Sequence, residues 1–223
     1  MRRVLLYVPL YREIPQARES WFIQSSHDAW VDVFIMRYNP FPDKGVYDNL
    51  AVKDKIARKM FLAGGYDFFF HVEDDIILPK YALHLLLQEN VPLISGLYRC
   101  RPETGGTYRM AERILDIEGP QDADDRPLEL RDIKNWGNVI ECTQAGNGCL
   151  LIRKDVMTEL EGVMGLDWKI YERLSPEYIK VLCHSGVICG HVDETGEIIG
   201  VKTHGNLPPY RLFDCSPEPS VPR

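Results

Sequence analysis

Runs of consecutive apolar residues alternate with amphipathic stretches along the first hundred residues of the chain. The apolar runs are typical of buried strands, and the stretches between them carry apolar side chains at the spacing of one helix face. Strands that are each followed by a helix predict a mostly parallel sheet with helices on both faces. We expect strands at 4–8, 31–36, 68–72 and 93–98, and helices at 16–29, 48–63 and 79–88.

Beyond residue 101 the pattern weakens and then recovers. Residues 102–138 show little periodicity and indicate a loop or insertion, and the proline-rich end at 207–223 indicates a tail or lid. The whole pattern predicts a single α/β domain. Between the two weak segments we expect strands at 139–143, 149–152, 187–192 and 198–202, and helices from Arg153 and over 175–185.

Composition limits the partners of the chain. Its 223 residues are 45% hydrophobic and carry a formal net charge of −7, and this acidic balance argues against a general nucleic-acid binder. No apolar run approaches the roughly 20 residues that span a bilayer. We therefore expect a cytoplasmic protein without a transmembrane segment, while peripheral membrane contact stays open.

The six cysteines include no CxxC pair, and several lie within apolar runs, which is typical of reduced, buried thiols in a cytosolic protein. Cys183, His184, Cys189 and His191 are residue types that bind zinc, and they are close in sequence. Strand alternation would place Cys189 and His191 on one face but not Cys183, so the pattern disfavours structural zinc.

Three consecutive acids, Glu73, Asp74 and Asp75, directly follow the apolar run at 68–72. Carboxylates at the end of a buried strand repel one another and lose hydration, which lowers stability unless a cation neutralises them. In open α/β sheets this strand end is also where ligands bind. The pattern predicts a hard divalent metal there, with phosphate oxygens on its far side.

Two common phosphate-binding motifs are missing from the sequence: no GxGxxG follows the first strand, and no GxxxxGK[ST] occurs. The motifs that are present resemble those of another family. VLLYVPLY, AGGYD, FFFHVEDDIILPKYALHLLL and VPLISGLYRCR look like the nucleotide-sugar-binding half of GT-A-fold glycosyltransferases, and GNGCLLIRKDVM and IIGVKTHGN are similar to later segments of that family. The resemblance covers most of 1–100 and 139–206.

The resemblance implies a metal centre at the acid triplet. The acidic motif of the family is written DxD, and Glu73, Asp74 and Asp75 stand in its place. Asp75 would bind Mn²⁺ or Mg²⁺, Glu73 would meet the ribose or the water shell of the metal, and Asp74 would lie in the nucleotide site. His204 would be the second protein ligand of the metal, with His191 as its competitor. A carboxylate edge needs such a bridging cation before it can bind a diphosphate.

Three residues after the first strand, Pro9, Tyr11 and Arg12, should reach the nucleotide base, on which an aromatic ring and a guanidinium can stack. Lys53 and Asp54 stand where relatives often carry an Arg-Asn or Arg-Asp pair that contacts the base and ribose. A solvated helix face is the alternative interpretation of these two residues.

Glycines and a further acid complete the expected site. Gly146 and Gly148 would let the backbone approach the donor sugar closely. Inverting relatives use an acid at a helix start as the base that deprotonates the acceptor hydroxyl. Glu177 is the nearest match, with Asp167 as the alternative, and a helix-capping role for Glu177 stays open. If neither acid is placed for this step, the enzyme would retain configuration.

These residues together predict a metal-dependent glycosyltransferase that moves a hexose from a UDP- or GDP-type sugar to a hydroxyl on a glycan, lipid or protein. The expected organisation is a nucleotide-sugar-binding half (1–101), an insertion (102–138), an acceptor-side half with the metal-ligand histidine (139–206) and a tail (207–223). A nucleotidyltransferase, or a nucleotide-sugar- or glycan-binding protein without turnover, stays open as an alternative.

Overall fold

The computed structural model describes residues 1–98, 111–114, 137–160, 170–171, 174 and 179–199. The described strands are β1 (Arg2–Pro9), β2 (Ala29–Met36), β3 (Phe68–Val72), β4 (Ile76–Ile77), β5 (Leu93–Leu97), β6 (Ala111–Ile114), β7 (Val139–Ala145), β8 (Cys149–Arg153), β9 (Val181–Ile188), β10 (Gly190–Val192) and β11 (Ile198–Ile199). The described helices are α1 (Pro15–Phe22), α2 (Val46–Ala63), α3 (Ala82–Gln88) and α4 (Lys154–Glu159).

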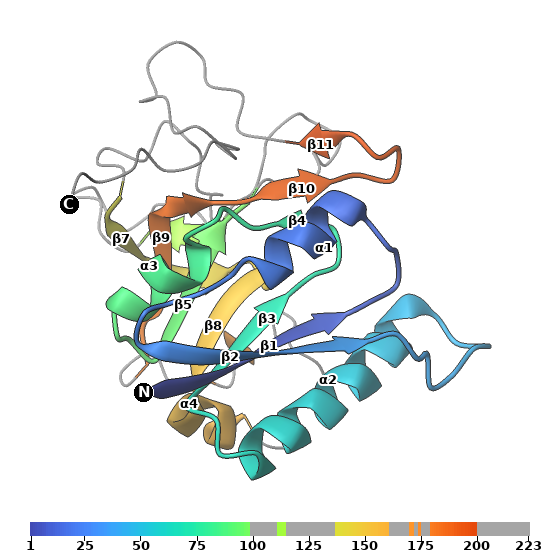
Figure 1. Cartoon of the computed structure of the whole chain (residues 1–223), viewed down its shortest axis with the longest axis horizontal. Helices are drawn as coiled ribbons and strands as arrows, with labels where there is room; N and C mark the ends of the chain where they lie inside the picture. The colour runs from blue at the N-terminus through green and yellow to red at the C-terminus, as the bar shows by residue number, and fades with distance from the viewer. Residues whose placement is uncertain (99–110, 115–136, 161–169, 172–173, 175–178, 200–223) are drawn as a thin grey trace, which may run out of the picture.

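The central element is an eight-stranded sheet in the order β2-β1-β3-β8-β5-β9-β7-β6, beside a small sheet in the order β11-β10-β4 (Figure 1). In the large sheet, β2, β1, β3, β5, β9 and β6 run in one direction, and β8 and β7 run in the other. Helices α2 and α4 pack on one face, and α1 and α3 lie on the opposite side (Figure 1). The predicted mixed, mostly parallel α/β sheet with helices on both faces is confirmed.

The continuous apolar runs arise because the inner strands are buried on both faces. In β1, Leu5 and Tyr7 belong to the core under α2 and α4, whereas Val4, Leu6 and Val8 belong to the core under α1 and α3. Strands covered on both sides lack the apolar–polar alternation of half-exposed strands.

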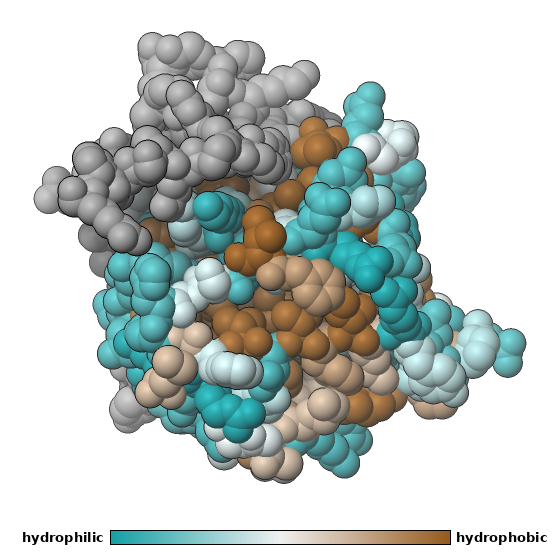
Figure 2. All heavy atoms as spheres, in the orientation of Figure 1, coloured by the Kyte–Doolittle hydropathy of each residue, from teal (hydrophilic) through white to brown (hydrophobic). Residues whose placement is uncertain are grey.

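The edge strand β2 differs from β1. Most of its residues are only half-buried, and Figure 2 shows apolar side chains gathered at the centre of this view, over the region where β1 and β2 run in Figure 1. β2 pairs only with β1 in the described sheet, so its exposure reflects its place at the edge.

The first half of the chain follows the predicted elements closely, with shifted helix ends. Helix α2 ends where two glycines follow it, and Gly65 has a φ of 71°, a conformation that glycine adopts without strain. Helix α1 ends at Phe22, earlier than predicted, and Ala29 already begins β2. Helix α3 begins later than predicted, at Ala82, behind the short strand β4 that the sequence analysis did not expect.

One prediction for the second half is wrong. The helix expected over 175–185 is excluded for 181–185, because Val181–Ile188 forms strand β9 between β5 and β7. Gly186 lies inside this strand and does not end a helix. A short apolar run fits a buried strand and a buried helix equally well, and pairing with β5 and β7 decides between them.

None of the helices in the described part of the chain combines the length and the apolar character needed to cross a bilayer.

Candidate functional site

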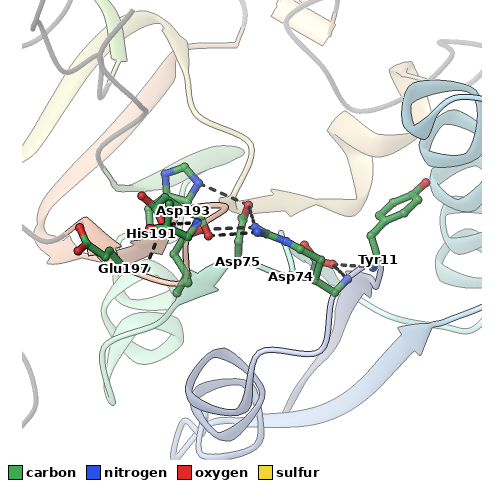
Figure 3. Close-up of polar contacts among 9 residues, drawn as sticks. Tyr11, Asp74, Asp75, His191, Asp193 and Glu197 are labelled. Atoms are coloured by element: carbon green, nitrogen blue, oxygen red, sulfur yellow. Dashed lines mark hydrogen bonds and ion pairs between the residues drawn. The ribbon is translucent and has the colours of Figure 1, made fainter.

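The acid triplet directly follows β3, as the sequence predicts, and it forms a tight turn that leads into β4. The Glu73 N–H donates to the Gly148 carbonyl at 3.1 Å, and the Ile76 N–H donates to the Glu73 carbonyl at 3.1 Å. All five residues of β3 are buried, so the turn projects its three carboxyl groups from a rigid strand. Figure 3 shows contacts running from Tyr11 and Asp74 on one side to Asp75, His191 and Asp193 on the other.

Asp74 anchors the loop that follows β1. Its Oδ2 accepts the backbone N–H groups of Tyr11 at 2.5 Å and Arg12 at 2.6 Å, and the residue is only 8% exposed. Burial raises the pKa of the Asp74 carboxyl, and the two backbone hydrogen bonds oppose that change. The structure therefore gives Asp74 a loop-holding role, and its predicted contact with a nucleotide stays a prediction.

Asp75 faces the small sheet and meets His191. The antiparallel pairing of β4 with β10 places His191 opposite Ile76, and the Val192 N–H donates to the Asp75 carbonyl at 2.8 Å. These contacts bring His191 Nε2 to 3.4 Å from Asp75 Oδ2. The Arg12 guanidinium reaches the same Oδ2, with Nη2 at 3.1 Å.

The donor set at Asp75 fits a divalent metal. Asp75 Oδ1 is buried and has no hydrogen-bond partner among the described residues, and a buried acceptor without a partner carries a free-energy cost that a bound cation would remove. Carboxylate oxygen suits Mg²⁺ and Mn²⁺, and imidazole also binds Mn²⁺. No group of three or more His, Cys, Asp or Glu side chains among the described residues could hold a metal ion. The remaining ligands would therefore come from water, from a diphosphate or from residues outside the described ones, such as His204.

Glu73 points toward the glycine loop before β8. An added Cβ on Gly148 would lie 3.0 Å from Glu73 Oε2. Burial is the largest cause that raises the pKa of Glu73 to about 7, and the negative charge of Asp75 adds to it, while His191 acts in the opposite direction. Arg12, Glu73, Asp75 and His191 form what we call the strand-edge cluster.

Four side chains that were not among the predicted site residues hold the loop around Gly146 and Gly148. The Asn147 carbonyl lies 2.7 Å from His71 Nδ1. The Gly146 carbonyl accepts a hydrogen bond from Ser95 Oγ at 2.9 Å. The loop is thus fixed before any ligand arrives. Tyr98 Oη accepts the Gly148 N–H at 2.9 Å, and Tyr171 Oη donates to the Ala145 carbonyl at 2.9 Å.

Tyr98 also packs edge-on against His191, with ring centroids 6.0 Å apart, so it connects the glycine loop to the strand-edge cluster. The sequence signal that could have identified Tyr98 is its position directly after β5, another strand that ends at the site edge.

Lys53 and Asp54 lie inside the protein. Lys53 is fully buried, donates to the Leu10 carbonyl at 2.8 Å and places Nζ 3.7 Å from the centre of the Tyr11 ring. Burial lowers the pKa of Lys53. Asp54 Oδ1 accepts the Tyr7 hydroxyl at 3.0 Å and lies 3.9 Å from His71 Nε2. Tyr7, Lys53, Asp54, Arg58 and His71 form what we call the interior cluster.

The interior position of Lys53 and Asp54 excludes the alternative interpretation of these residues as a solvated helix face. Tyr11 is the member of this group that lies nearer the surface, and its hydroxyl donates to the Val46 carbonyl at 3.0 Å. Burial is the largest cause that raises the pKa of Tyr11 to about 12. Pro9 is buried at the end of β1. The base contacts of Pro9, Tyr11, Lys53 and Asp54 stay predictions.

Three predicted site residues, Glu177, Asp167 and His204, lie outside the described residues. Their roles as base and metal ligand stay predictions, although strand β9 occupies 181–185 of the helix that Glu177 was expected to open. The disfavoured zinc set does not converge either: His184 Nε2 lies 3.5 Å from Glu89 Oε1, while His191 faces Asp75.

Comparisons with known proteins bear on the fold. No protein-family model matches the chain. No curated protein matches it either. Among solved structures, protein A197 from STIV matches with a TM-score of 0.55 and 15% sequence identity, over 92% of this chain and 96% of that chain.

Two further solved structures are similar. GalNAc-T7, crystallised with UDP, GalNAc and Mn²⁺, has a TM-score of 0.54 and 11% identity, over 85% of this chain and 43% of that chain, so this chain spans less than half of its length. A UDP-glucose pyrophosphorylase complexed with UDP-glucose has a TM-score of 0.42 and 9% identity, over 85% of this chain and 92% of that chain, which is too distant to carry an argument. Identities this low show the fold alone: the chain has a GT-A-like mixed α/β fold.

Proposed function

We propose that this protein is a metal-dependent glycosyltransferase that transfers a hexose from a nucleoside-diphosphate sugar to a hydroxyl acceptor. One observation carries the proposal: Asp75, just beyond the C-terminal end of a buried strand in a GT-A-like fold, has a buried Oδ1 with no hydrogen-bond partner among the described residues. Its other oxygen, Oδ2, lies 3.4 Å from His191 Nε2. Ligands of open α/β sheets bind at that strand end.

Asp75 and His191 would hold Mn²⁺ or Mg²⁺, with His204 as the second candidate for the histidine ligand. A bound metal would neutralise the diphosphate and the charge that develops on the leaving group. The histidine choice differs from the sequence-based expectation, because His191 contacts Asp75 within the described residues.

The protein's own residues would position the donor. Asp74 accepts the backbone N–H groups of Tyr11 and Arg12, and these two residues would form the nucleotide side of the cluster. On the other side Gly148 leaves no room for a side chain, since an added Cβ would lie 2.8 Å from Ile76 and 2.9 Å from Tyr98, so its backbone can approach a sugar. Residues 1–101 would thus form the nucleotide-sugar-binding half and 139–206 the acceptor side.

The acceptor base would be Glu177 or Asp167, and the donor a UDP- or GDP-type sugar. The acceptor would be a hydroxyl on a glycan, lipid or protein. A cytoplasmic location fits the four described cysteines, which are buried and free, because reducing compartments keep thiols in that state.

A thermal-shift panel tests the donor site. UDP, GDP, CDP and ADP are each added with and without Mn²⁺ to wild type, Asp75→Asn and the surface control Asp43→Asn, because a ligand that binds the native state raises the melting temperature. We expect a Mn²⁺-dependent rise with one nucleotide in wild type and Asp43→Asn, and none in Asp75→Asn. A rise of unchanged size in Asp75→Asn, or no rise with any nucleotide, would refute the proposal.

Turnover is tested with the sugar conjugate of the nucleotide that binds. A glycosyltransferase usually releases free sugar slowly to water when no acceptor is present, and Asp75→Asn should abolish that release. Binding without any release would point to a binding protein instead of an enzyme.

A further inference from the structure

The Arg12 guanidinium lies among three oxygen atoms that belong to two distant segments. Nη2 donates to Asp75 Oδ2 at 3.1 Å and to the Val192 carbonyl at 3.3 Å, and Nη1 donates to the Asp193 carbonyl at 3.1 Å. One carboxylate and two carbonyls directed at a single positive group form an oxygen-lined position for a cation.

Both ends of this contact are held in place. The Arg12 backbone is fixed because its N–H donates to Asp74 at 2.6 Å. On the other side, Asp193 Oδ1 accepts the backbone N–H groups of Thr195 at 2.8 Å and Glu197 at 2.9 Å, which fixes the turn between β10 and β11. The guanidinium therefore bridges two ordered segments.

Asp75 is the residue that this bridge shares with the metal site. Its Oδ2 already has two nitrogen neighbours, Arg12 Nη2 at 3.1 Å and His191 Nε2 at 3.4 Å. A divalent cation on Asp75 would lie close to the charge of Arg12, and like charges at such a distance repel strongly where water is partly excluded.

We propose that Arg12 is an internal counter-cation that competes with the divalent metal for Asp75 while the nucleotide is absent. The inference rests on the proposed function, because it takes Asp75 as a metal ligand. Arg12 stabilises the acid cluster in the free protein and weakens metal binding there.

A nucleoside diphosphate would relieve this competition. Its phosphate oxygens offer the guanidinium another anion, and Arg binds phosphate through two parallel hydrogen bonds. Metal and nucleotide should therefore bind with positive coupling, and each should raise the affinity for the other by the same factor.

The test measures Mn²⁺ binding by isothermal titration calorimetry and by the EPR signal of free Mn²⁺, both without nucleotide and with saturating UDP or GDP. The variants are Arg12→Gln, Arg12→Lys and the matched control Arg18→Gln, which removes an exposed arginine that pairs with Glu13. Without nucleotide, Arg12→Gln should bind Mn²⁺ about tenfold more tightly than wild type, and Arg18→Gln should match wild type.

Arg12→Lys checks that charge is the cause. It keeps a positive charge near Asp75 but lacks the planar fork that reaches the two carbonyls, so its Mn²⁺ affinity should lie between wild type and Arg12→Gln. With UDP or GDP present, the difference between wild type and Arg12→Gln should shrink. Equal or weaker Mn²⁺ binding by Arg12→Gln, or Arg12→Lys binding as tightly as Arg12→Gln, would overturn the inference.

Asp75→Asn separates this inference from the proposed function. If wild type binds Mn²⁺, Asp75→Asn does not, and Arg12→Gln equals wild type, then the metal site stands and only the competition is refuted. If neither wild type nor any variant binds Mn²⁺, with or without UDP or GDP, both proposals fail together.

Discussion

The interior cluster and the strand-edge cluster both contain an aspartate beside a histidine, yet they differ in exposure and in how their charges are compensated. Asp54 and His71 of the interior cluster are each 1% exposed and Lys53 is not exposed at all. In the strand-edge cluster, the side chains of His191, Asp75 and Arg12 are 14%, 22% and 39% exposed.

The difference sets the interior cluster apart from the cluster to which we assign the metal ligands. In the interior cluster, Asp54 accepts the Tyr7 hydroxyl and its charge favours the protonated forms of Lys53 and Arg58. In the strand-edge cluster, Asp75 Oδ1 accepts no hydrogen bond from any residue in the described part of the chain. Residue type alone does not distinguish the two aspartates, whereas exposure and an acceptor without a partner do.

Replacing Asp54 tests whether the interior cluster is structural, and it should have the largest effect on stability. Asp54→Ala removes the acceptor of the Tyr7 hydroxyl and a negative charge that acts on Lys53 and Arg58. Removing one partner of a buried group of charges typically costs about 3–5 kcal/mol. We expect the free energy of unfolding, measured by urea denaturation, to fall by that amount.

The exposed Asp43 supplies the control, because Asp43→Ala should change the free energy of unfolding by less than about 0.5 kcal/mol. The melting temperature of Asp54→Ala, although lower, should still rise when nucleotide and Mn²⁺ are added. An unchanged free energy of unfolding, together with no rise in melting temperature on adding nucleotide and Mn²⁺, would place Asp54 in the ligand site and would contradict its structural role.

The sequence predicts the first half of the fold, because apolar runs such as Phe68–Val72 alternate there with amphipathic stretches. It does not predict β9, since His184 and Ser185 interrupt the apolar residues of Val181–Ile188 and its partners, β5 and β7, are distant in sequence. Two-residue strands such as β4 also escape sequence analysis, because their existence depends on pairing with β10.

The candidate site could be predicted where it follows a recognisable strand, and not where it depends on contacts between elements that are distant in sequence. The acid triplet follows a strand that can be recognised, so its place at the sheet edge could be predicted. The contact between Asp75 and His191 depends on the pairing of β4 with β10, and the interior position of Asp54 depends on which side of α2 faces β1. Both are tertiary facts that no local pattern contains.

Adding a methyl group at Gly148 tests whether the glycine loop beside the strand-edge cluster faces the sugar. In Gly148→Ala the new Cβ would lie 2.8 Å from Ile76 Cγ1, 2.9 Å from Tyr98 Cζ and 3.0 Å from Glu73 Oε2, so these side chains must shift. Overpacking of this kind costs about 1–3 kcal/mol. We expect a lower melting temperature and a larger loss of affinity for the sugar nucleotide than for the free nucleotide.

Gly45→Ala is the control for that experiment, because no heavy atom outside its neighbours lies within 4 Å of an added Cβ. As Gly45 precedes α2 as its N-cap, the change should cost no more than about 1 kcal/mol and leave both affinities intact. Equal losses for the sugar nucleotide and the free nucleotide in Gly148→Ala would mean that the loop does not face the sugar.

The smallest expected effect concerns Glu73 and pH in the metal-free protein. Burial and the neighbouring Asp75 raise the pKa of Glu73 to about 7 in the folded state, against about 4.3 in an unfolded chain. Between these values the folded protein keeps a proton that the unfolded chain has released, so the free energy of unfolding falls as pH rises through this window. Glu73→Gln removes this titration and should make stability less dependent on pH.

Urea denaturation in EDTA at pH 5 and pH 8 measures the effect as a difference between wild type and Glu73→Gln, so that the titration of Asp74 cancels. Wild type should lose about 1–2 kcal/mol more than the variant between the two pH values, because a difference of one in pKa corresponds to about 1.4 kcal/mol and Glu73 is partly exposed. A parallel dependence in both proteins would show that Glu73 titrates as an ordinary surface carboxyl. The burial of Glu73 and its repulsion by Asp75 would then be too weak to raise the pKa of Glu73.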